Sequence, residues 1–269
     1  MSEGKARYRA VFVSDIHLGS VSCKSEAIQK FMQQCDCEYL YLVGDIIDMW
    51  VSRRKGKWQQ SHSNVVRSIL GKAKYGTKVY LTPGNHDAEF RRMNGLDFGN
   101  IFIDHQFTHT TLQDKKLLII HGDYLDRSVT TLKPLAVMGA WLHEGMSNVN
   151  IVTNKIRTKL GKKPSDFSSN AKKRVKSFIR YFTNFEDRIC VDAKNGGFDG
   201  VVCGHIHRPA FEINDEAGIM YINTGDWMDH CTAMVEHQDG RLEMLKWCPA
   251  SESLQRASTS LTSAGRELL

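Results

Sequence analysis

Seven side chains in this sequence have the chemistry of metal ligands, and their spacing indicates that they act together. They are Asp15, His17, Asp45, Asn85, His121, His205 and His207. One residue separates the members of each pair 15/17 and 205/207, so in an extended backbone both side chains point to the same side and can reach one cation. Asp45 has two carboxylate oxygens and can bridge two cations. Divalent cations bound in this way can activate water for hydrolysis.

Each candidate ligand taken alone has an ordinary structural explanation. An Asp after a strand commonly closes a turn or caps a helix, and a lone His is more often a hydrogen-bonded polar residue than a ligand. Seven such residues after five separate apolar runs are hard to explain by coincidence. Glycine allows tight turns and close approach of the backbone to an ion or a phosphate. Four glycines directly adjoin the candidates: Gly44, Gly84, Gly122 and Gly204.

Short apolar runs end directly before these polar residues, and we predict that the runs are strands. They cover residues 8–13, 39–43, 78–81, 117–120 and 200–203. Helical spacing of apolar residues predicts helices over 25–34 and 61–75. Strands with helices between them predict a layered α/β fold, in which ligands lie beyond the carboxyl ends of the strands. Such a fold places all seven candidates at one edge.

Two regions differ from this α/β pattern. Residues 127–195 carry no strand signal and look helical, and residues 250–269 are rich in Ser, Thr and Ala with little apolar content. We therefore expect a core over 1–126 and 196–249, a helical lid insertion over 127–195 and a mobile tail over 250–269. The sequence predicts nothing about the oligomeric state.

The composition is that of a soluble globular protein with a basic excess. The chain has 269 residues, of which 41% are hydrophobic and 25% charged, and its formal net charge is +6. No window is apolar enough to span a bilayer, and no signal-peptide pattern precedes the first strand. We therefore expect a cytoplasmic protein, for which any contact with a membrane is peripheral. Seven scattered cysteines without zinc-finger spacing predict reduced thiols.

Five blocks of the sequence resemble the motifs of calcineurin-like metallophosphoesterases. In the family's order over residues 8–226, they are Asp15-Ile16-His17, Gly44-Asp45-Ile46-Ile47-Asp48, Gly84-Asn85-His86-Asp87, His121-Gly122-Asp123 and Gly204-His205-Ile206-His207. The resemblance implies a four-layer α/β/β/α sandwich with two divalent cations. Mixed oxygen and imidazole ligands favour Mn²⁺, with Fe or Zn²⁺ as alternatives.

The resemblance also implies a role for each block. One cation would be bound by Asp15, His17, Asp45 and His207, and the other by Asp45, Asn85, His121 and His205. The cations would lie about 3.5–4 Å apart, polarise phosphoryl oxygens and activate a water for in-line attack on phosphorus. His86, with Asp87 nearby, would stabilise the transition state or protonate the leaving group. Asp48 and Asp123 are expected to orient histidine ligands, with ordinary turn or cap roles as the alternative.

A closer resemblance is to the bacterial UDP-2,3-diacylglucosamine pyrophosphatases of lipid A synthesis. It rests on residues 14–19, 42–48, 204–210 and 223–227, and on the insertion that follows Asp123. The resemblance implies cleavage of a nucleotide-linked lipid to UMP and an acylated sugar 1-phosphate, under a lid that takes the acyl chains. The sequence departs from that family at His86, where the family usually carries Arg, and at Tyr124-Leu125-Asp126.

The expected lid combines apolar stripes with dense positive charge. Between residues 150 and 180, Lys and Arg are frequent and Asp166 is the only acidic residue. This pattern suits an anionic amphiphile or a membrane surface, and a solvated helical face is the alternative. In and beside this insertion, the candidate substrate contacts are Asp126, Trp141, Arg174 and Phe178.

Other activities are compatible with the same motifs. A phosphodiesterase or phosphatase acting on a soluble nucleotide, a cyclic nucleotide or a phosphoprotein would use the same ligands, and His86 is the residue found in such general enzymes. A catalytically inactive scaffold is disfavoured because every expected ligand is present. A nucleic-acid substrate is not expected, because no aromatic and basic stacking pattern is evident outside the insertion.

Overall fold

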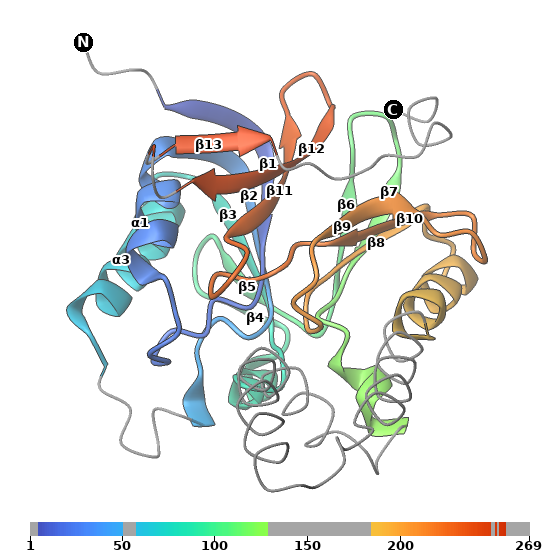
Figure 1. Cartoon of the computed structure of the whole chain (residues 1–269), viewed down its shortest axis with the longest axis horizontal. Coiled ribbons are helices and arrows are strands. Elements are labelled where there is room, and N and C mark those ends of the chain that lie inside the picture. Colours follow the sequence, from blue (N-terminus) through green and yellow to red (C-terminus); the bar gives the residue numbers. More distant parts are fainter. Residues whose placement is uncertain (1–4, 51–57, 129–183, 249–250, 252, 257–269) are drawn as a thin grey trace, which may run out of the picture. The chain divides into compact units, whose positions relative to one another are not determined.

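The computed structural model describes residues 5–50, 58–128, 184–248, 251 and 253–256. The chain divides into a larger unit, Met1–Asp123 with Asp187–Leu269, and a smaller unit, Tyr124–Glu186. All the described strands belong to the larger unit and form two sheets, shown in Figure 1.

The first sheet has eight strands in the order β13-β12-β11-β1-β2-β3-β5-β4. Their bounds are β1 Ala6–Val13, β2 Cys35–Val43, β3 Lys78–Thr82, β4 Leu96–Asp97, β5 Ile101–Ile103, β11 Thr232–His237, β12 Leu242–Cys248 and β13 Ser253–Arg256. Strands β1, β2, β3 and β5 are parallel, whereas β11, β12 and β13 pair antiparallel along the other side of β1. The carboxyl ends of β1, β2 and β3 therefore lie at one edge.

The second sheet has five strands in the order β6-β7-β8-β10-β9. Their bounds are β6 Phe107–Thr110, β7 Lys116–Ile119, β8 Gly200–Cys203, β9 Ala210–Ile213 and β10 Met220–Asn223. The three central strands β7, β8 and β10 are parallel to one another. Their carboxyl ends also share one edge, so each sheet presents a row of strand ends.

Side chains along the strands of the first sheet point alternately to its two faces, and the apolar core therefore has two clusters, one on each face. On β1, Ala10 and Phe12 face the second sheet and belong to an apolar cluster with Ile119, Val202 and Ile222 of that sheet. Their neighbours Val11 and Val13 point the other way and join the opposite cluster. Successive side chains of a strand point to opposite faces, so one strand serves both clusters.

Helices cover the outer faces of both sheets. On the first sheet, α1 (Ser25–Gln34) packs against α3 (Gln60–Lys74) and buries Phe31 in the outer cluster. On the second, a helix over residues 184–195 brings Cys190 near Cys203 of β8, and Lys194 Nζ donates to Ala217 O at 2.6 Å. In Figure 1 this helix lies beside β8 and β10. The larger unit is thus the expected four-layer α/β/β/α sandwich.

The strands predicted from apolar runs agree with β1, β2, β3, β7 and β8, and both predicted helices agree with α1 and α3. The expectation of a tail from residue 250 does not hold for Ser253–Arg256, because β13 pairs with β12 there. The expected insertion over 127–195 lies largely outside the described residues, and the chain from Asp187 onward groups with the core. None of the described helices is long and apolar enough to cross a membrane.

Candidate metal centre

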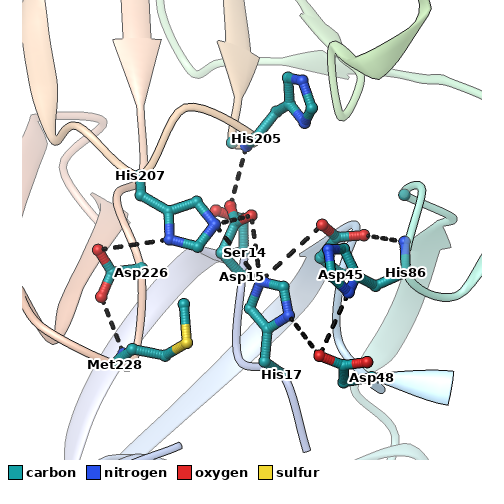
Figure 2. Close-up of polar contacts among 12 residues, drawn as sticks. Ser14, Asp15, His17, Asp45, Asp48, His86, His205, His207, Asp226 and Met228 are labelled. Atoms are coloured by element: carbon teal, nitrogen blue, oxygen red, sulfur yellow. Dashed lines mark hydrogen bonds and ion pairs between the residues drawn. The ribbon is translucent and has the colours of Figure 1, made fainter. Parts of the chain in front are cut away.

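The seven candidate ligands all follow strands that end at these two edges. From the first sheet, Asp15 and His17 follow β1, Asp45 follows β2 and Asn85 follows β3; from the second, His121 follows β7, and His205 and His207 follow β8. Figure 2 shows residues from both sheets pointing toward one another. Residues 190 positions apart in sequence are therefore in contact, because the His205 backbone N–H donates to Asp15 Oδ2 at 3.0 Å.

One group of candidate ligands consists of Asp15, His17 and His207. Asp15 Oδ1 lies 3.1 Å from His207 Nε2 and 3.8 Å from His17 Nε2, and the two imidazole nitrogens are 3.4 Å apart. One ligand atom from each residue lies within 4.8 Å of the others. That spacing suits three donors around one cation.

A second group consists of Asp45, His121 and His205, with ligand atoms again within 4.8 Å of one another. Asp45 Oδ2 lies 3.4 Å from His121 Nε2 and 3.9 Å from His17 Nε2 of the first group. Asp45 therefore stands between the two groups, where a bridging ligand would have to be. Asp45, His17 and His86 form a further group with the same spacing.

Several buried polar atoms of this cluster lack a hydrogen-bond partner among the described residues. Among the seven candidates they are Asp15 Oδ1, Asn85 Oδ1 and His121 Nε2. The other ring nitrogen of His121 donates to Val43 O at 2.9 Å, so Nε2 is the nitrogen that faces Asp45 and is available to a cation. Buried polar atoms are nearly always paired, so an amide oxygen and an imidazole nitrogen left in this state fit a site for a cation.

The backbone at five of the seven candidates is left-handed. Asp15, His17, Asp45, His205 and His207 have φ values from 50° to 70°. The expectation that the paired residues share a side because their backbone is extended is therefore wrong for both pairs. Backbone hydrogen bonds between neighbouring loops hold the first pair instead, from Asp15 N to Gly44 O at 3.0 Å and from His17 N to Asp45 O at 2.9 Å. Each such position costs about 1–3 kcal/mol, which the surrounding loops must compensate.

The glycines beside the ligands leave room for ligand side chains. A Cβ on Gly44 would lie 2.3 Å from His121 Nδ1, and one on Gly84 would lie 2.2 Å from Asp45 Oδ1. A Cβ on Gly204 would lie 2.3 Å from Asp15 Oδ2. Because a side chain at these positions would displace a candidate ligand, the glycines are required by the crowding of the site.

The residues expected to support the ligands divide into different roles. Asp48 Oδ2 lies 3.5 Å from His17 Nδ1 and 3.2 Å from His86 Nδ1, so one carboxylate faces two imidazoles. Asp123 contacts Arg91 instead, whose Nη2 donates to Asp123 Oδ2 at 2.7 Å and to Gly84 O at 3.1 Å. This contact ties the loop after β7 to the loop after β3, because Arg91 lies on the short helix η1 (Ala88–Met93).

Asp87 is fully buried, and its carboxylate accepts hydrogen bonds from the backbone of two neighbouring loops. It accepts N–H bonds from Gly84 at 2.7 Å and from Ile46 at 2.8 Å, with a longer bond from Asp45 at 3.3 Å. Burial and the nearby Asp45 carboxylate raise the pKa of Asp87. This placement fastens the Asp45 loop to the Asn85 loop, and we therefore interpret Asp87 as a positioning residue and not as a catalytic one.

His86 is held on several sides. Its backbone N–H donates to Asp45 Oδ1 at 2.7 Å, and its ring lies 4.2 Å from the ring of Trp50, centroid to centroid, at an interplanar angle of 32°. Trp50 was not predicted as part of the site, although it is an aromatic residue two positions after Asp48. The roles of Arg91 and of Asp226, whose carboxylate lies 4.0 Å from His207 Nδ1, were not predicted either.

Electrostatics within the cluster favour bound positive charge. Burial alone would raise the pKa of Asp45, but the adjacent His121 lowers it to about 2. Burial alone would lower the pKa of His121, but Asp45 and Asp15 raise it to about 10, and Asp15 and Asp48 likewise raise the pKa of His17 to about 10. Burial and the neighbouring His121 together lower the pKa of His205 to about 4. A cation entering the site would thus replace protons on His17 and His121.

The expected substrate contacts cannot be placed on this framework. Asp126 lies on the short helix η2 (Asp123–Ser128), but its side chain is outside the described part of the structure. Trp141, Arg174 and Phe178 also lie outside the described residues. These four assignments stay predictions.

Comparison with known proteins shows which family the chain matches. Residues 8–209 match the model of the calcineurin-like phosphoesterases. UDP-2,3-diacylglucosamine hydrolase of Haemophilus influenzae (strain PittGG) is 26% identical over 233 residues, covering 84% of this chain and 93% of that protein. The enzyme of the same name from Edwardsiella ictaluri is 24% identical, covering 94% of this chain and 98% of that protein.

Among solved structures, the chain is similar to wild-type Vps29 of Entamoeba histolytica complexed with Zn²⁺. The TM-score is 0.46 at 8% identity, over 92% of this chain and 97% of that one. This likeness is too slight to bear on function. The family match covers most of the chain and includes all the candidate ligands. The chain therefore belongs to the calcineurin-like phosphoesterase family and is a metal-dependent phosphoesterase.

Proposed function

We propose that the protein hydrolyses the pyrophosphate bond of UDP-2,3-diacylglucosamine, or of a similar nucleotide-linked lipid, to UMP and an acylated sugar 1-phosphate. The observation that carries the hydrolytic part is the position of Asp45 between two groups of candidate ligands. The substrate part rests on relatives that bear this enzyme's name and align over most of the chain. Such a substrate would require peripheral contact with the cytoplasmic face of the inner membrane.

The first group, Asp15, His17 and His207, would hold one cation together with Asp45. The second group, Asp45, His121 and His205, would hold the other together with Asn85, so Asp45 would be shared between the cations. Two divalent cations would neutralise phosphoryl charge and activate a water for attack on phosphorus. Mn²⁺ suits the mixture of carboxylate, amide and imidazole donors, and Fe or Zn²⁺ are the alternatives.

His86 would act on the substrate itself. Its side chain is 24% exposed, more than that of Asp45 or His17. Asp48 faces its Nδ1 and Trp50 packs on its ring, so the imidazole is held in one orientation. A ring fixed in this way can donate a proton or a hydrogen bond to the leaving phosphate oxygen.

A comparison of substrates tests this proposal. With Mn²⁺ present, kcat/KM would be measured for UDP-2,3-diacylglucosamine, for UDP-N-acetylglucosamine and for bis(p-nitrophenyl) phosphate. Each buried acyl methylene is worth about 0.8 kcal/mol, so four of them predict a preference of roughly 200-fold for the acylated substrate over the bare UDP-sugar. Equal rates on acylated and bare substrates would refute the lipid part and leave the phosphoesterase assignment intact.

The second candidate is a phosphodiesterase or phosphatase acting on a soluble nucleotide or a phosphoprotein. The residue that favours it is His86, since the lipid A enzymes usually carry Arg at that position. This alternative predicts efficient cleavage of a soluble cyclic or linear nucleotide and no gain from acyl chains. The same panel, extended with 2′,3′-cyclic AMP and a phosphopeptide, distinguishes the two.

A further inference from the structure

The turn that follows β10 supplies His207 with a second carboxylate neighbour. We propose that Asp226 is a positioning residue that holds the His207 imidazole with Nε2 toward the first cation position. This inference rests on the metal centre proposed above, and it adds a residue that the five motifs do not contain. Figure 2 shows Asp226 and Asp15 on opposite sides of the His207 ring.

The two nitrogens of the His207 ring face different carboxylates. Nε2 lies 3.1 Å from Asp15 Oδ1, inside the group of candidate ligands, whereas Nδ1 lies 4.0 Å from Asp226 Oδ2. The longer distance is an ion-pair contact, and a shift of about 1 Å would convert it to a direct hydrogen bond. A carboxylate beyond a histidine ligand fixes the ring and its tautomer and makes the other nitrogen a better ligand.

Asp226 is itself held rigidly. It is 1% exposed, and its Oδ1 accepts backbone N–H bonds from Met228 at 2.8 Å and from His230 at 3.1 Å. The His230 ring donates from Nδ1 to Oδ2 at 2.5 Å. Oδ1 is thus used by the turn, while Oδ2 is the oxygen that faces both histidines.

The same turn is also joined to the backbone of a candidate ligand. Trp227, the residue after Asp226, donates its N–H to Asp15 O at 3.0 Å. Strand β10, which leads into the turn, pairs with β8, which leads to His207. The turn therefore contacts the Asp15 loop through its backbone and His207 through the Asp226 side chain. The position of the Asp226 carboxylate is thus fixed relative to the candidate ligands Asp15 and His207.

His17 shows the same arrangement in the same group, because its Nδ1 faces Asp48 Oδ2 at 3.5 Å. His121, in the other group, donates from Nδ1 to a backbone carbonyl, Val43 O, at 2.9 Å. Both imidazoles of the first group thus have a charged partner, and His121 has a neutral one. Loss of the Asp226 charge should accordingly affect the first cation position and leave the second nearly unchanged.

Titration of the metal-stripped full-length chain with Mn²⁺ by calorimetry tests this inference. Asp226→Asn keeps an oxygen for the backbone N–H groups and removes the charge that faces His207. It should weaken one of two Mn²⁺ binding steps by about 10–100-fold and leave the other within about threefold. Asp229→Asn is the matched control: it makes the same charge change on an exposed residue of the same turn and should bind like wild type.

Unfolding temperatures of the metal-free proteins separate positioning from general stability. If Asp226→Asn lowers the unfolding temperature but keeps both binding steps within threefold of wild type, Asp226 only caps its turn and the inference is wrong. If that variant does not fold, Asp226→Ser takes its place, because a serine hydroxyl can still accept a backbone N–H of the turn, and an unchanged titration again overturns the inference. If the wild-type chain binds a single Mn²⁺, the two-metal proposal is refuted instead. The role of Asp226 then depends on whether Asp226→Asn weakens that single binding step by about 10–100-fold.

Discussion

The two sheets contribute different chemistry to the candidate metal centre. The eight-stranded sheet supplies Asp15, His17, Asp45 and Asn85, whereas the five-stranded sheet supplies His121, His205 and His207. Among the seven candidates, both carboxylates and the amide thus come from one sheet, and the other sheet gives imidazoles alone. The charged oxygen ligands would come from the first sheet, and the second would complete the coordination.

The short contacts between these groups cross from one sheet to the other. Asp15 Oδ1 and His207 Nε2 are 3.1 Å apart, and Asp45 Oδ2 and His121 Nε2 are 3.4 Å apart. Neither sheet alone can form the site, so the distances between ligands depend on how the apolar cluster between the sheets packs. The four predictions that follow test this division of roles, beginning with the largest expected effect.

Removal of the shared carboxylate should have the largest effect. Asp45→Asn keeps the shape but removes the charge between the two groups, and we expect kcat/KM to fall by about 10⁴-fold or more, as for other residues that act as one catalytic unit. Metal content, measured by mass spectrometry of the purified protein, should fall by at least one ion per chain. Asp97→Asn, an exposed change on β4 of the same sheet, is the control and should leave both quantities unchanged. A variant that keeps both metals and its activity would contradict the bridging role.

A substitution of His86 tests whether the first sheet supplies an imidazole that acts on the substrate in addition to His17, the candidate metal ligand. His86→Ala should lower kcat by about 10²–10⁴-fold, the usual contribution of a proton donor, while metal content stays equal to wild type. His105→Ala, on an exposed residue, is the control. Loss of a metal ion, with recovery of kcat when Mn²⁺ is added in excess, would instead make His86 a ligand within the group it forms with His17 and Asp45.

The packing between the sheets can be compared with the packing under the helices. Ile222 lies in the inter-sheet cluster and Ile28 in the cluster under α1, and both are fully buried. Replacing either by Val should lower the free energy of unfolding by about 0.5–1.5 kcal/mol, measured by urea unfolding of the metal-free protein. Mn²⁺ affinity should fall a few-fold in Ile222→Val and stay unchanged in Ile28→Val. Equal affinities in the two variants would show that ligand distances do not depend on the inter-sheet core.

A charge network away from the metal centre also joins the sheets. Glu236 on β11 accepts from His109 Nε2 at 2.7 Å and from Leu112 N at 2.8 Å, and it pairs with Arg9 of β1. Burial would raise the pKa of Glu236, but these partners lower it below its ordinary value of 4.5. The folded state therefore gains stability from ionised Glu236 above that value and loses it as the pH falls through the lower, folded-state pKa.

Urea unfolding of the metal-free protein from about pH 7 to about pH 3 measures this small effect. Wild type should be more stable than Glu236→Gln at neutral pH, and the difference should shrink below about pH 4.5. Glu216→Gln, an exposed change in the loop between β9 and β10, is the control and should track wild type. A difference that is constant over the whole range would mean that the network contributes through shape and not through charge.

Local sequence was enough to predict the strands that carry the ligands, because each is an apolar run that stops at a polar residue. It was not enough for β13, whose Ser253–Arg256 segment has little apolar character and is a strand because it pairs with β12. The short strands β4 and β5 were not predicted either, because two or three residues are too few to show an alternation of apolar and polar side chains. Their structure depends on partners far away in the sequence.

The candidate ligands were recognisable from residue type and order, but their supporting contacts were not. Asp87 and Asp123 looked alike as acidic residues beside a motif, yet one accepts backbone N–H groups and the other binds Arg91. Which donor meets each carboxylate depends on how two loops from different strands pack together. The left-handed backbone of Asp15 and His17 also has no local signature, because glycine is absent at those positions.

The left-handed turns restrict how the centre can vary in evolution or by design. Asp, Asn and His enter this backbone region far more readily than most residues other than glycine, and they are also metal ligands. Glu has the same carboxylate as Asp, but it lacks this tolerance and has a longer stem. A conservative exchange of Asp15 or Asp45 for Glu would thus have to overcome both a displaced oxygen and an unfavourable φ. Any redesign for another metal must draw on this short set of residues or rebuild the turns first.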